Sequence, residues 1–277
     1  MADATGEARP AGPRGAPGRA ATWRIIGSLS LAFLLVTVVS QTLGLVARQQ
    51  TTEQKTYDHV VVRKLQLATG SASVQVRAGK DDRVVVRRNL NYTFRAPQVS
   101  TVIEGDVLVV GVSCRQPLPF LSCGAEIELE VPQGTGVTGS VDSGSVDVAD
   151  LSGEVRLDAT SGALYLRRLS GEVHTRTTSG MVQGTELGSG RVEASSTSGS
   201  VELDFVRAPH AVDVSTTSGS ATMTLPKGSR YAFSGQVGSG SRSLDPNLSD
   251  ASSPDSLRAS VASGSLRIGY REDGRSG

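Results

Sequence analysis

The sequence is poor in aromatic residues and cysteine, and this restricts the kind of core that it can build. Aromatic residues make up 4% of the 277 positions, and cysteine occurs only twice. Large rings supply much of the apolar area of a thick globular core, so such a core is not expected. Glycine is abundant instead, at 32 residues. This composition favours many thin layers of Val, Leu and Ala.

The sequence also lacks an excess of charge of either sign. It has 28 basic and 27 acidic residues, and its formal net charge is +1. A nucleic-acid-binding chain normally carries a strong basic excess. We therefore expect no nucleic acid among its partners.

Residues 25–47 form the only long stretch without a charged side chain. About 20 apolar residues span the hydrocarbon core of a bilayer as a helix. Four arginines precede the stretch, whereas one Arg and one Lys follow it within ten residues. Because basic flanks stay in the cytoplasm, we expect a single-pass helix in the cell membrane, with a cytoplasmic N-terminus and an extracytoplasmic C-terminal part. The alternative is a cleaved signal peptide, with Thr42-Leu43-Gly44 as the cleavage site.

The membrane segment sets the predicted domain organisation. The first 24 residues are rich in Ala, Gly, Pro and Arg and lack an apolar period, which indicates a disordered tail. The predicted regions are a cytoplasmic tail at 1–24, a transmembrane helix at 25–47, a linker at 48–57, an exported domain at 58–271 and a tail at 272–277. The exported domain divides into a strand-rich part at 58–132 and a repeat part with a C-terminal cap at 133–271.

The two cysteines, Cys114 and Cys123, flank a Pro-Leu-Pro sequence between two alternating apolar runs. A hairpin there would bring the sulfurs together, and export would favour a disulfide. Closing so short a loop would contribute about 2–3 kcal/mol. A metal site would need further ligands, and a redox pair usually has the tighter C-x-x-C spacing. We predict a structural disulfide.

Ser-Gly recurs at nearly constant spacing from residue 143 onward, with steps of 9, 9, 9, 9, 10, 9 and 20 residues between glycines. Thr and Leu precede the pair alternately, so the true unit spans 18 to 20 residues. We expect each glycine to form a structural corner by adopting a positive φ. These corner glycines are Gly144, Gly153, Gly162, Gly171, Gly180, Gly190, Gly199 and Gly219.

Apolar residues occupy the second and fourth positions after most of these glycines, as in Val155/Leu157 and Leu164/Leu166, and thinner pairs with a smaller fourth residue are Val173/Thr175, Val182/Gly184 and Val192/Ala194. This alternation is typical of a strand with one buried face. Two short strands and two corners in each coil of 18–20 residues predict an all-β fold, a parallel β-solenoid preceded by one transmembrane α-helix. Coils would stack about 4.8 Å apart, and residues 58–132 would form the N-terminal layers and the cap that an open end requires.

The same register predicts columns of charge on the outside of the solenoid. Neighbours in a column should carry opposite signs, because cross-strand pairs of opposite charge are favourable. The predicted columns and pairs are Arg156, His174, Glu193 and then Asp213 in one column, Asp158 beside Arg176, and Glu172 near Arg191.

No motif in the sequence carries recognisable chemistry. His174 is expected in the outer column as a surface residue, and His210 in a solvated loop. No Ser or Thr pairs with a His and an acid at a known spacing, and no Gly-rich stretch precedes a helix. The stretch VDSGSVDV at 141–148 lacks the Gly-Gly that calcium-binding repeats carry in every turn. We predict no catalytic residue, no cofactor and no metal.

These features resemble those of the bacterial putative-adhesin β-strand-repeat family. The resemblance rests on Ser-Gly-x-Val-x-Val/Leu units from Ser143 to Met223 and on the leading stretch GSASVQV…DRVVV…GDVLVV…C…C…AEIELEVPQG. It covers roughly residues 58–270. It implies a membrane-anchored protein of a largely uncharacterised family, some members of which are linked to envelope stress.

Three functions remain open at this point. The first is an exported, adhesin-like binding or structural module of the cell envelope, with cell-wall glycans or envelope proteins as partners. The second is an accessory component of an envelope-stress sensing system, which would need a separate output partner because the cytoplasmic tail is short. The third is a polysaccharide-active enzyme, which would need clustered carboxylates on one face. The predicted columns mix signs, so we expect no enzymatic activity.

Overall fold

The computed structural model describes residues 30–35, 49–58, 60–80, 83–92, 96–113 and 123–271. Contacts divide the chain into two units, Met1–Arg48 and Gln49–Gly277. In the first unit, the described residues 30–35 are helical. Within the described ranges, no helix is long and apolar enough to span a bilayer. Most of the predicted transmembrane segment, together with Cys114 and the side chain of Cys123, lies outside the described residues.

The second unit is an all-β structure, as predicted. Its described part forms one 17-stranded sheet that folds over on itself, and one short 3-10 helix. The elements are β1 Gln49–Tyr57, β2 Lys64–Thr69, β3 Ser73–Ala78, β4 Val84–Tyr92, β5 Gln98–Glu104, β6 Val107–Ser113, β7 Cys123–Val131, β8 Gly136–Val141, β9 Ser145–Ala149, β10 Val155–Ala159, β11 Ala163–Arg167, β12 Val173–Thr177, β13 Met181–Leu187, β14 Arg191–Phe205, β15 Ala211–Leu225, β16 Ala232–Leu244, η1 Pro246–Leu248 and β17 Ser256–Tyr270.

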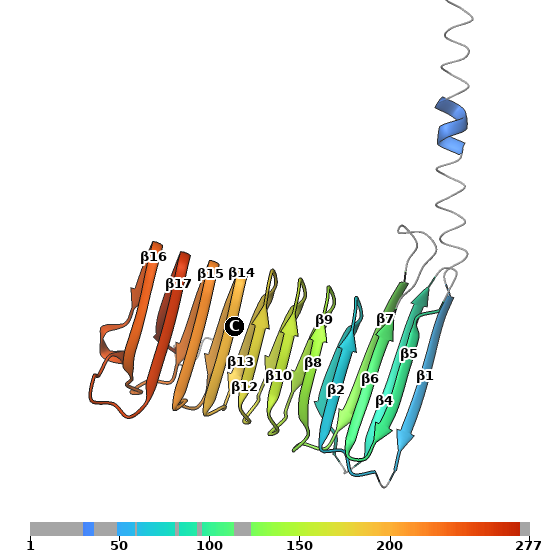
Figure 1. Ribbon diagram of the computed structural model, residues 1–277, viewed down its shortest axis with the longest axis horizontal. Coiled ribbons are helices and arrows are strands. Elements are labelled where there is room, and N and C mark those ends of the chain that lie inside the picture. Colours follow the sequence, from blue (N-terminus) through green and yellow to red (C-terminus); the bar gives the residue numbers. More distant parts are fainter. Residues whose placement is uncertain are drawn as a thin grey trace, which may run out of the picture. The chain divides into compact units, whose positions relative to one another are not determined.

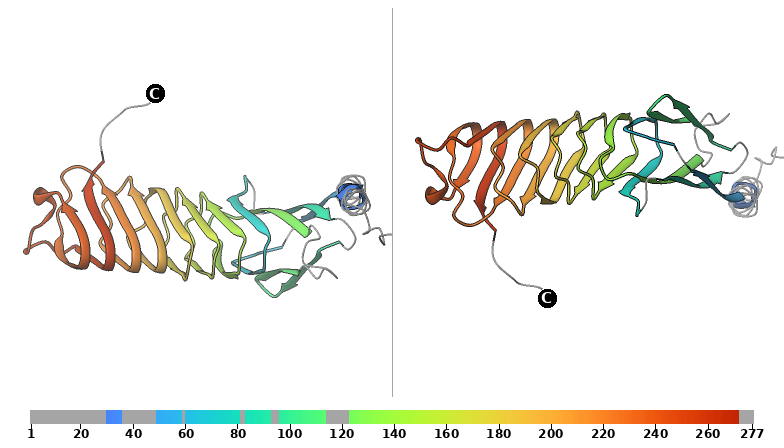
Figure 2. Two further views of the ribbon diagram at one scale, coloured as in Figure 1. Left: turned by 90° about the horizontal axis from the view of Figure 1, so that it is seen from above. Right: turned by 90° about the horizontal axis from the view of Figure 1, so that it is seen from below.

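The repeats stack as parallel coils in two layers (Figures 1 and 2). The first layer contains β2, β6, β8, β10, β12 and the N-terminal halves of β14, β15, β16 and β17. The second layer contains β3, β7, β9, β11, β13 and the C-terminal halves of the same four strands. In β14 to β17 the chain passes the corner without a break, so the predicted pair of short strands becomes one long strand.

The residues predicted to face the interior are buried between the two layers. Leu157, Leu164 and Leu166 are each 0% exposed, and the smaller residues of the thinner pairs, such as Thr175, are buried as well. The other buried members are Val146, Val148, Val155, Val173, Val182, Val192, Ala194, Val201, Leu203, Val212, Val214, Ala221 and Met223. The inward register predicted from period-2 alternation is therefore confirmed.

A charge at Leu166 should disrupt this interior, whereas a charge at the outward-facing Gln183 should not. Leu166→Lys would place an unpaired cation between the layers, and we expect it to lower the free energy of unfolding by about 3–5 kcal/mol or to prevent folding. Gln183→Lys would lie beside Glu202 in the next coil, and we expect a change of about 0.5 kcal/mol or less. Urea denaturation of both variants measures the difference, and equal tolerance would contradict the register.

The coils do not stack in sequence order at either end, contrary to the expectation that each coil lies on the preceding one. At the N-terminal end, β2 lies between β6 and β8, and β3 lies between β7 and β9. At the C-terminal end, β17 lies between β15 and β16 (Figure 1). The first and last coils of the chain are therefore internal to the stack, and the coils next to them in sequence form its outer ends.

The N-terminal end of the solenoid adds antiparallel pairs, β1 with β4, β4 with β7 and β5 with β6, so this end departs from the predicted parallel pattern.

At each end of the interior, an arginine reaches across the layers. At the N-terminal end, Arg88 of β4 donates a hydrogen bond of 2.8 Å to Thr101 of β5. At the other end, the guanidinium of Arg242 lies 4.9 Å from the ring centre of Phe233. A stacked array needs such caps because each terminal coil would otherwise expose its apolar interior.

The role predicted for the corner glycines was wrong in its mechanism. Of the eight, only Gly219 has a positive φ, at 154°. The other seven have no positive φ, so a left-handed backbone is not what selects glycine at those positions.

Close stacking selects glycine at most of the corners instead. A Cβ added to Gly162 would lie within 3.0 Å of the carbonyl oxygen of Gly144, and one added to Gly180 would meet that of Gly162 in the same way. The series continues through the coils, including the reordered C-terminal ones, as Gly199 on Gly180, Gly219 on Gly199, Gly264 on Gly219 and Gly240 on Gly264. The Ser-Gly period therefore marks the positions at which the backbones of neighbouring coils approach each other closely.

In the described structure, the non-glycine residues with positive φ lie at the opposite corners, and all of them are charged. Asp150, Arg168 and Glu186 follow one another at 18-residue intervals, with φ of 65°, 51° and 55°. Arg168 donates hydrogen bonds of 2.6 and 2.9 Å to Asp150 and lies 3.7 Å from Glu186. The hydrogen bonds from Arg168 lower the pKa of Asp150. The pair thus stabilises the fold above the ordinary pKa of a carboxyl group, and its contribution is lost as pH falls through the lowered value.

Glu186 carries left-handed strain with only a distant ion pair to offset it. A non-glycine residue in this region costs about 1–2 kcal/mol, whereas an exposed ion pair contributes about 0–1 kcal/mol. We expect Glu186→Gly to raise the free energy of unfolding by about 0.5–1 kcal/mol. Glu202→Gly, in the extended strand β14, should lower it by a similar amount. Chemical denaturation compares the two, and destabilisation by both would contradict the strain at this corner.

Candidate functional site: the polar outer face of the first layer

The outer face of the first layer is mainly polar from β8 to β16 and contains two hollows. Two columns of side chains run across the coils on this face. The first column is Thr138, Arg156, His174, Glu193, Asp213, Arg258 and Ser234, and the second is Ser140, Asp158, Arg176, Ser195, Ser215, Ser260 and Gln236. The positions of the columns predicted from the sequence are confirmed as far as Asp213, but Glu193 and Asp213 are neighbours of like charge.

The N-terminal half of this face is charged. It holds a hollow of about 370 Å³ lined by Arg156, Asp158, His174, Thr175, Arg176, Glu193 and Ser195. Neighbours of opposite charge occur in each column, His174 beside Glu193 in the first and Asp158 beside Arg176 in the second, and such neighbours favour pairing between strands. Of these two pairs, His174 and Glu193 are in direct contact, at 3.3 Å.

His174 lies at the centre of this charged half. Its Nδ1 is 3.3 Å from a carboxylate oxygen of Glu193, and its Nε2 is 3.6 Å from Glu172 and 3.9 Å from Glu154. Arg156 competes for Glu154 at 2.7 Å. The three carboxylates thus surround the ring without converging on one point. In the part of the chain that the structure describes, no group of three His, Cys, Asp or Glu side chains could hold a metal ion.

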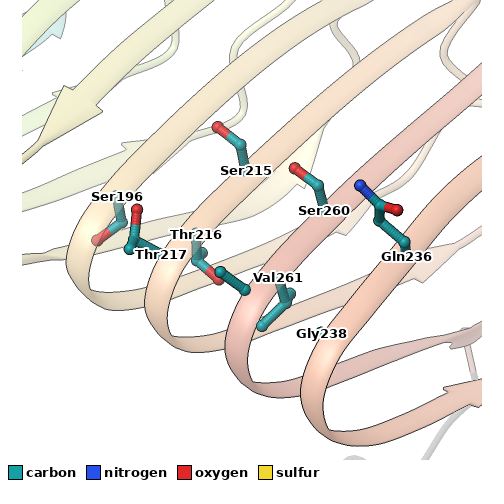
Figure 3. A pocket seen from close by; sticks show the side chains of 9 residues that line it. Ser196, Ser215, Thr216, Thr217, Gln236, Gly238, Ser260 and Val261 are labelled. Carbon is teal, nitrogen blue, oxygen red and sulfur yellow. The ribbon is translucent and has the colours of Figure 1, made fainter.

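The C-terminal half of the same face carries one ion pair, Arg258 with Asp213 at 3.4 Å, and its second column is uncharged. It holds a larger hollow of about 460 Å³, which we call the hydroxyl groove. Its lining residues are Ser196, Ser215, Thr216, Thr217, Gln236, Gly238, Ser260, Val261 and Ala262. Figure 3 shows them on four adjacent coils, with the Ser215 and Ser260 side chains pointing the same way. Hydroxyl and amide groups therefore supply all of its side-chain hydrogen-bonding capacity.

The four coils bring together residues that are far apart in the sequence, and sequence reasoning missed the groove for this reason. Ser215 pairs with Ser260, and Ser260 with Gln236, because β17 is inserted between β15 and β16. A sequence-ordered stack would instead place β16 directly on β15. The Thr-Ser-Gly sequences at 197–199 and 217–219 were the available signal, since they place hydroxyls beside the corners of β14 and β15.

A third hollow, of about 530 Å³, lies at the N-terminal end of the solenoid. It is lined by Gln50, Thr51, Thr52, Ser71, Ser73, Asn89, Leu90, Asn91, Gly124, Ala125 and Glu126. Strand β1 contributes one side of it and presents almost only polar side chains. This composition suits an edge strand, because polar edges resist pairing with other chains.

His210 is better connected than the sequence indicated. Its Nδ1 lies 3.0 Å from a carboxylate oxygen of Asp255, although its side chain remains 83% exposed. The pair joins the turn before β15 to the segment before β17, and the backbone amide of Ser256 donates to the carbonyl of His210 nearby. This contact fastens the inserted coil to its neighbour.

Of the residues singled out from the sequence, the structure describes the corner glycines but not the side chains of the two cysteines. The glycines lie at corners, and Gly190 alone among the eight is free of close backbone contact, since a Cβ there would meet only His210, at 3.5 Å. The predicted disulfide between Cys114 and Cys123 stays a prediction, because it falls outside the described residues.

The two-layer stack of short parallel coils defines a class of protein, the all-β repeat proteins of solenoid type. Within that class, the Toastrack DUF4097 family profile matches residues 62–275, and the chain belongs to this family. Its model covers the whole solenoid, including both ends where the coil order is altered.

Several solved structures are similar to the chain. A "putative adhesin" from Parabacteroides merdae ATCC 43184 is 14% identical, with 79% of this chain and 96% of that one covered and a TM-score of 0.48. A "putative adhesin" from Bacteroides fragilis NCTC 9343 is 12% identical, covering 79% and 97%, at 0.41. A "putative cell adhesion protein" from Clostridium sporogenes ATCC 15579 is 13% identical, covering 80% and 100%, at 0.39. No curated protein matches the chain.

Proposed function

We propose that the protein is a membrane-anchored, exported binding and structural module of the bacterial cell envelope, without enzymatic activity. The observation that carries the proposal is the polar outer face of the first layer, which presents two hollows on a stack of buried, closely packed coils. A scaffold of this kind holds its surface groups in fixed positions, which favours binding. The ion-paired charges and neutral hydroxyls of this face are groups that bind ligands rather than an array of catalytic acids and bases.

The anchor in this proposal is the apolar segment 25–47 with its preceding arginines. A single helix there would hold the solenoid at the outer surface of the cell membrane, where cell-wall polymers and envelope proteins are within reach.

Two measurements on cells that produce the full chain test the proposal. Protease added to intact cells should degrade the part beyond about residue 50, while a cytoplasmic control protein survives. The purified full chain should also sediment with isolated cell-wall material, and a variant with the first-layer face altered should sediment less. Full protection from protease would contradict the predicted topology, and absence of binding to envelope material would contradict the binding role.

A further inference from the structure

We propose that the hydroxyl groove binds a segment of a neutral, hydroxyl-rich glycan that lies along the solenoid axis. This inference rests on the proposed binding function and assigns it a site and a class of ligand. The groove volume of about 460 Å³ is within the range of ligand sites, about 300–1,000 Å³. It is also large enough to hold one or two sugar rings.

The lining of the groove selects against charged ligands. Six of its nine lining residues carry a neutral hydroxyl or amide side chain, and the other three are Gly238, Val261 and Ala262. An anionic polymer would find no arginine or lysine in this lining, whereas phosphate and carboxylate sites are normally built from such cations. A neutral glycan needs only the donors and acceptors that Ser, Thr and Gln supply.

Two buried hydroxyls in the groove have unused hydrogen-bonding capacity. Ser196 and Thr216 are each 5% exposed, and in the described structure neither hydroxyl has a hydrogen-bond partner. A buried polar group without a partner costs about 1–3 kcal/mol. Their register partner Val261 is a core residue, so these two hydroxyls face inward, and the side chains available to a ligand are those of the outward Ser215, Ser260 and Gln236.

The orientation of the ligand follows from the stacking of the coils. Ser215, Ser260 and Gln236 occupy equivalent positions on β15, β17 and β16. Neighbouring parallel strands lie about 4.8 Å apart, which is comparable with the length of one sugar residue. The polar groups therefore repeat along the solenoid axis, in the direction that an extended polymer would follow.

The charged hollow on the same face can be compared with the hydroxyl groove. Its N-terminal half has a hollow of about 370 Å³ lined by Arg156, Asp158, Arg176 and Glu193, among others. That hollow carries charges of both signs and would suit a charged ligand. We assign the neutral glycan to the hydroxyl groove alone.

Isothermal titration calorimetry on the full chain tests the assignment. The chain is purified in a detergent without a sugar headgroup, and the probes are the neutral hexasaccharides cellohexaose, maltohexaose and chitohexaose and the anionic hexagalacturonate. At least one neutral probe should bind. Ser260→Tyr, which fills the groove from an exposed position, should weaken that binding by about tenfold or more, and Gln236→Ala by about threefold.

Two control variants separate a specific site from a general effect. Ser265→Tyr places the same ring on the same strand but on the second layer, and Arg176→Gln alters the charged hollow. Both should bind the neutral probe within about twofold of the unaltered chain. Circular dichroism confirms that each variant is folded, and Gln236→Ala provides the test if Ser260→Tyr does not fold.

The results that would overturn the inference are distinct from those that would overturn the proposed function. Binding of hexagalacturonate alone, equal losses in Ser265→Tyr and Ser260→Tyr, or no binding of any hexasaccharide would each contradict the neutral-glycan groove. If the chain still sediments with cell-wall material in those cases, the binding function stands and only its assignment to the hydroxyl groove is wrong.

Discussion

Replacing Gly180 by alanine should destabilise the solenoid strongly, although only one methyl group is added. The new Cβ would lie within 3.0 Å of the backbone carbonyl of Gly162 in the adjacent coil. Backbone cannot move aside there without separating two hydrogen-bonded coils. Overpacking that forces such shifts costs about 1–3 kcal/mol or more. We expect Gly180→Ala to lower the free energy of unfolding by at least about 3 kcal/mol.

Gly190 provides a matched control within the same Ser-Gly series. A Cβ at Gly190 would make only ordinary van der Waals contact, 3.5 Å from His210. We expect Gly190→Ala to change the free energy of unfolding by about 0.5 kcal/mol or less, or to raise it slightly by restricting the unfolded chain. Urea denaturation of both variants distinguishes stacking from conformational freedom. Equal effects at the two positions would contradict the stacking role of the corner glycines.

A chain that ends after Asp255 lacks β17, and we expect β16 to lose its folded structure as well. Within the described structure, β16 pairs in the sheet with β17 alone, while β17 bridges β15 and β16. The loss of β17 also removes five buried apolar residues, Leu257, Ala259, Val261, Leu266 and Ile268. We expect a decrease of about 3–5 kcal/mol in the free energy of unfolding, after the entropy regained by the shorter chain is considered.

Hydrogen exchange measured by mass spectrometry gives the decisive readout for this truncation. The amides of β16 should exchange almost as fast as in an unfolded chain, while those of β8 to β13 remain protected. A chain ending after Gly228, which lacks both β16 and β17, should match its stability. Retained protection of β16 in the chain that ends at Asp255 would indicate that β16 stacks directly on β15, contrary to the structure.

The interior of the solenoid could be predicted from the sequence because it depends on local periodicity. Alternation placed Leu157 and Leu166 inside, and the 18-residue unit placed His174 beside Glu193 across 19 positions. Each inference required only that neighbouring repeats adopt the same conformation. That condition holds wherever the repeats themselves are regular.

The altered coil order at the two ends could not be read from the same pattern. Repeat matching fixes which residues are equivalent, such as Ser218, Ser239 and Ser263, but it does not fix which equivalent coils are neighbours. The order depends on the long connections around η1 and between β3 and β6, which carry no Ser-Gly period. The hydroxyl groove was missed as a direct consequence, since it requires Ser260 to lie between Ser215 and Gln236.

The role of glycine at the corners was misjudged for a related reason. Sequence reasoning considers the conformation of one chain segment, in which glycine is associated with positive φ. The constraint at Gly162 and Gly180 comes from the adjacent coil, about 4.8 Å away. Positive φ angles also occur at Asp150, Arg168 and Glu186, where hydrogen bonds join Arg168 to Asp150 and a longer ion pair joins it to Glu186.

Disulfide trapping of the C-terminal coils directly tests the stacking order, in which β17 lies between β15 and β16. Cysteines are introduced in pairs at three equivalent exposed corner serines, in a chain that also carries Cys114→Ser and Cys123→Ser. Ser218 and Ser263 are register partners on β15 and β17, whereas Ser218 and Ser239 are separated by the inserted coil. Partners about 4.8 Å apart are within reach of a disulfide, and positions two coils apart are beyond its limit of about 7 Å.

We expect the 218/263 pair to form a disulfide under mild oxidation, as detected by mass spectrometry of the digested chain, and the 218/239 pair to form none. The converse result, with crosslinking of 218 to 239 and none of 218 to 263, would show that the coils stack in sequence order and would contradict the account.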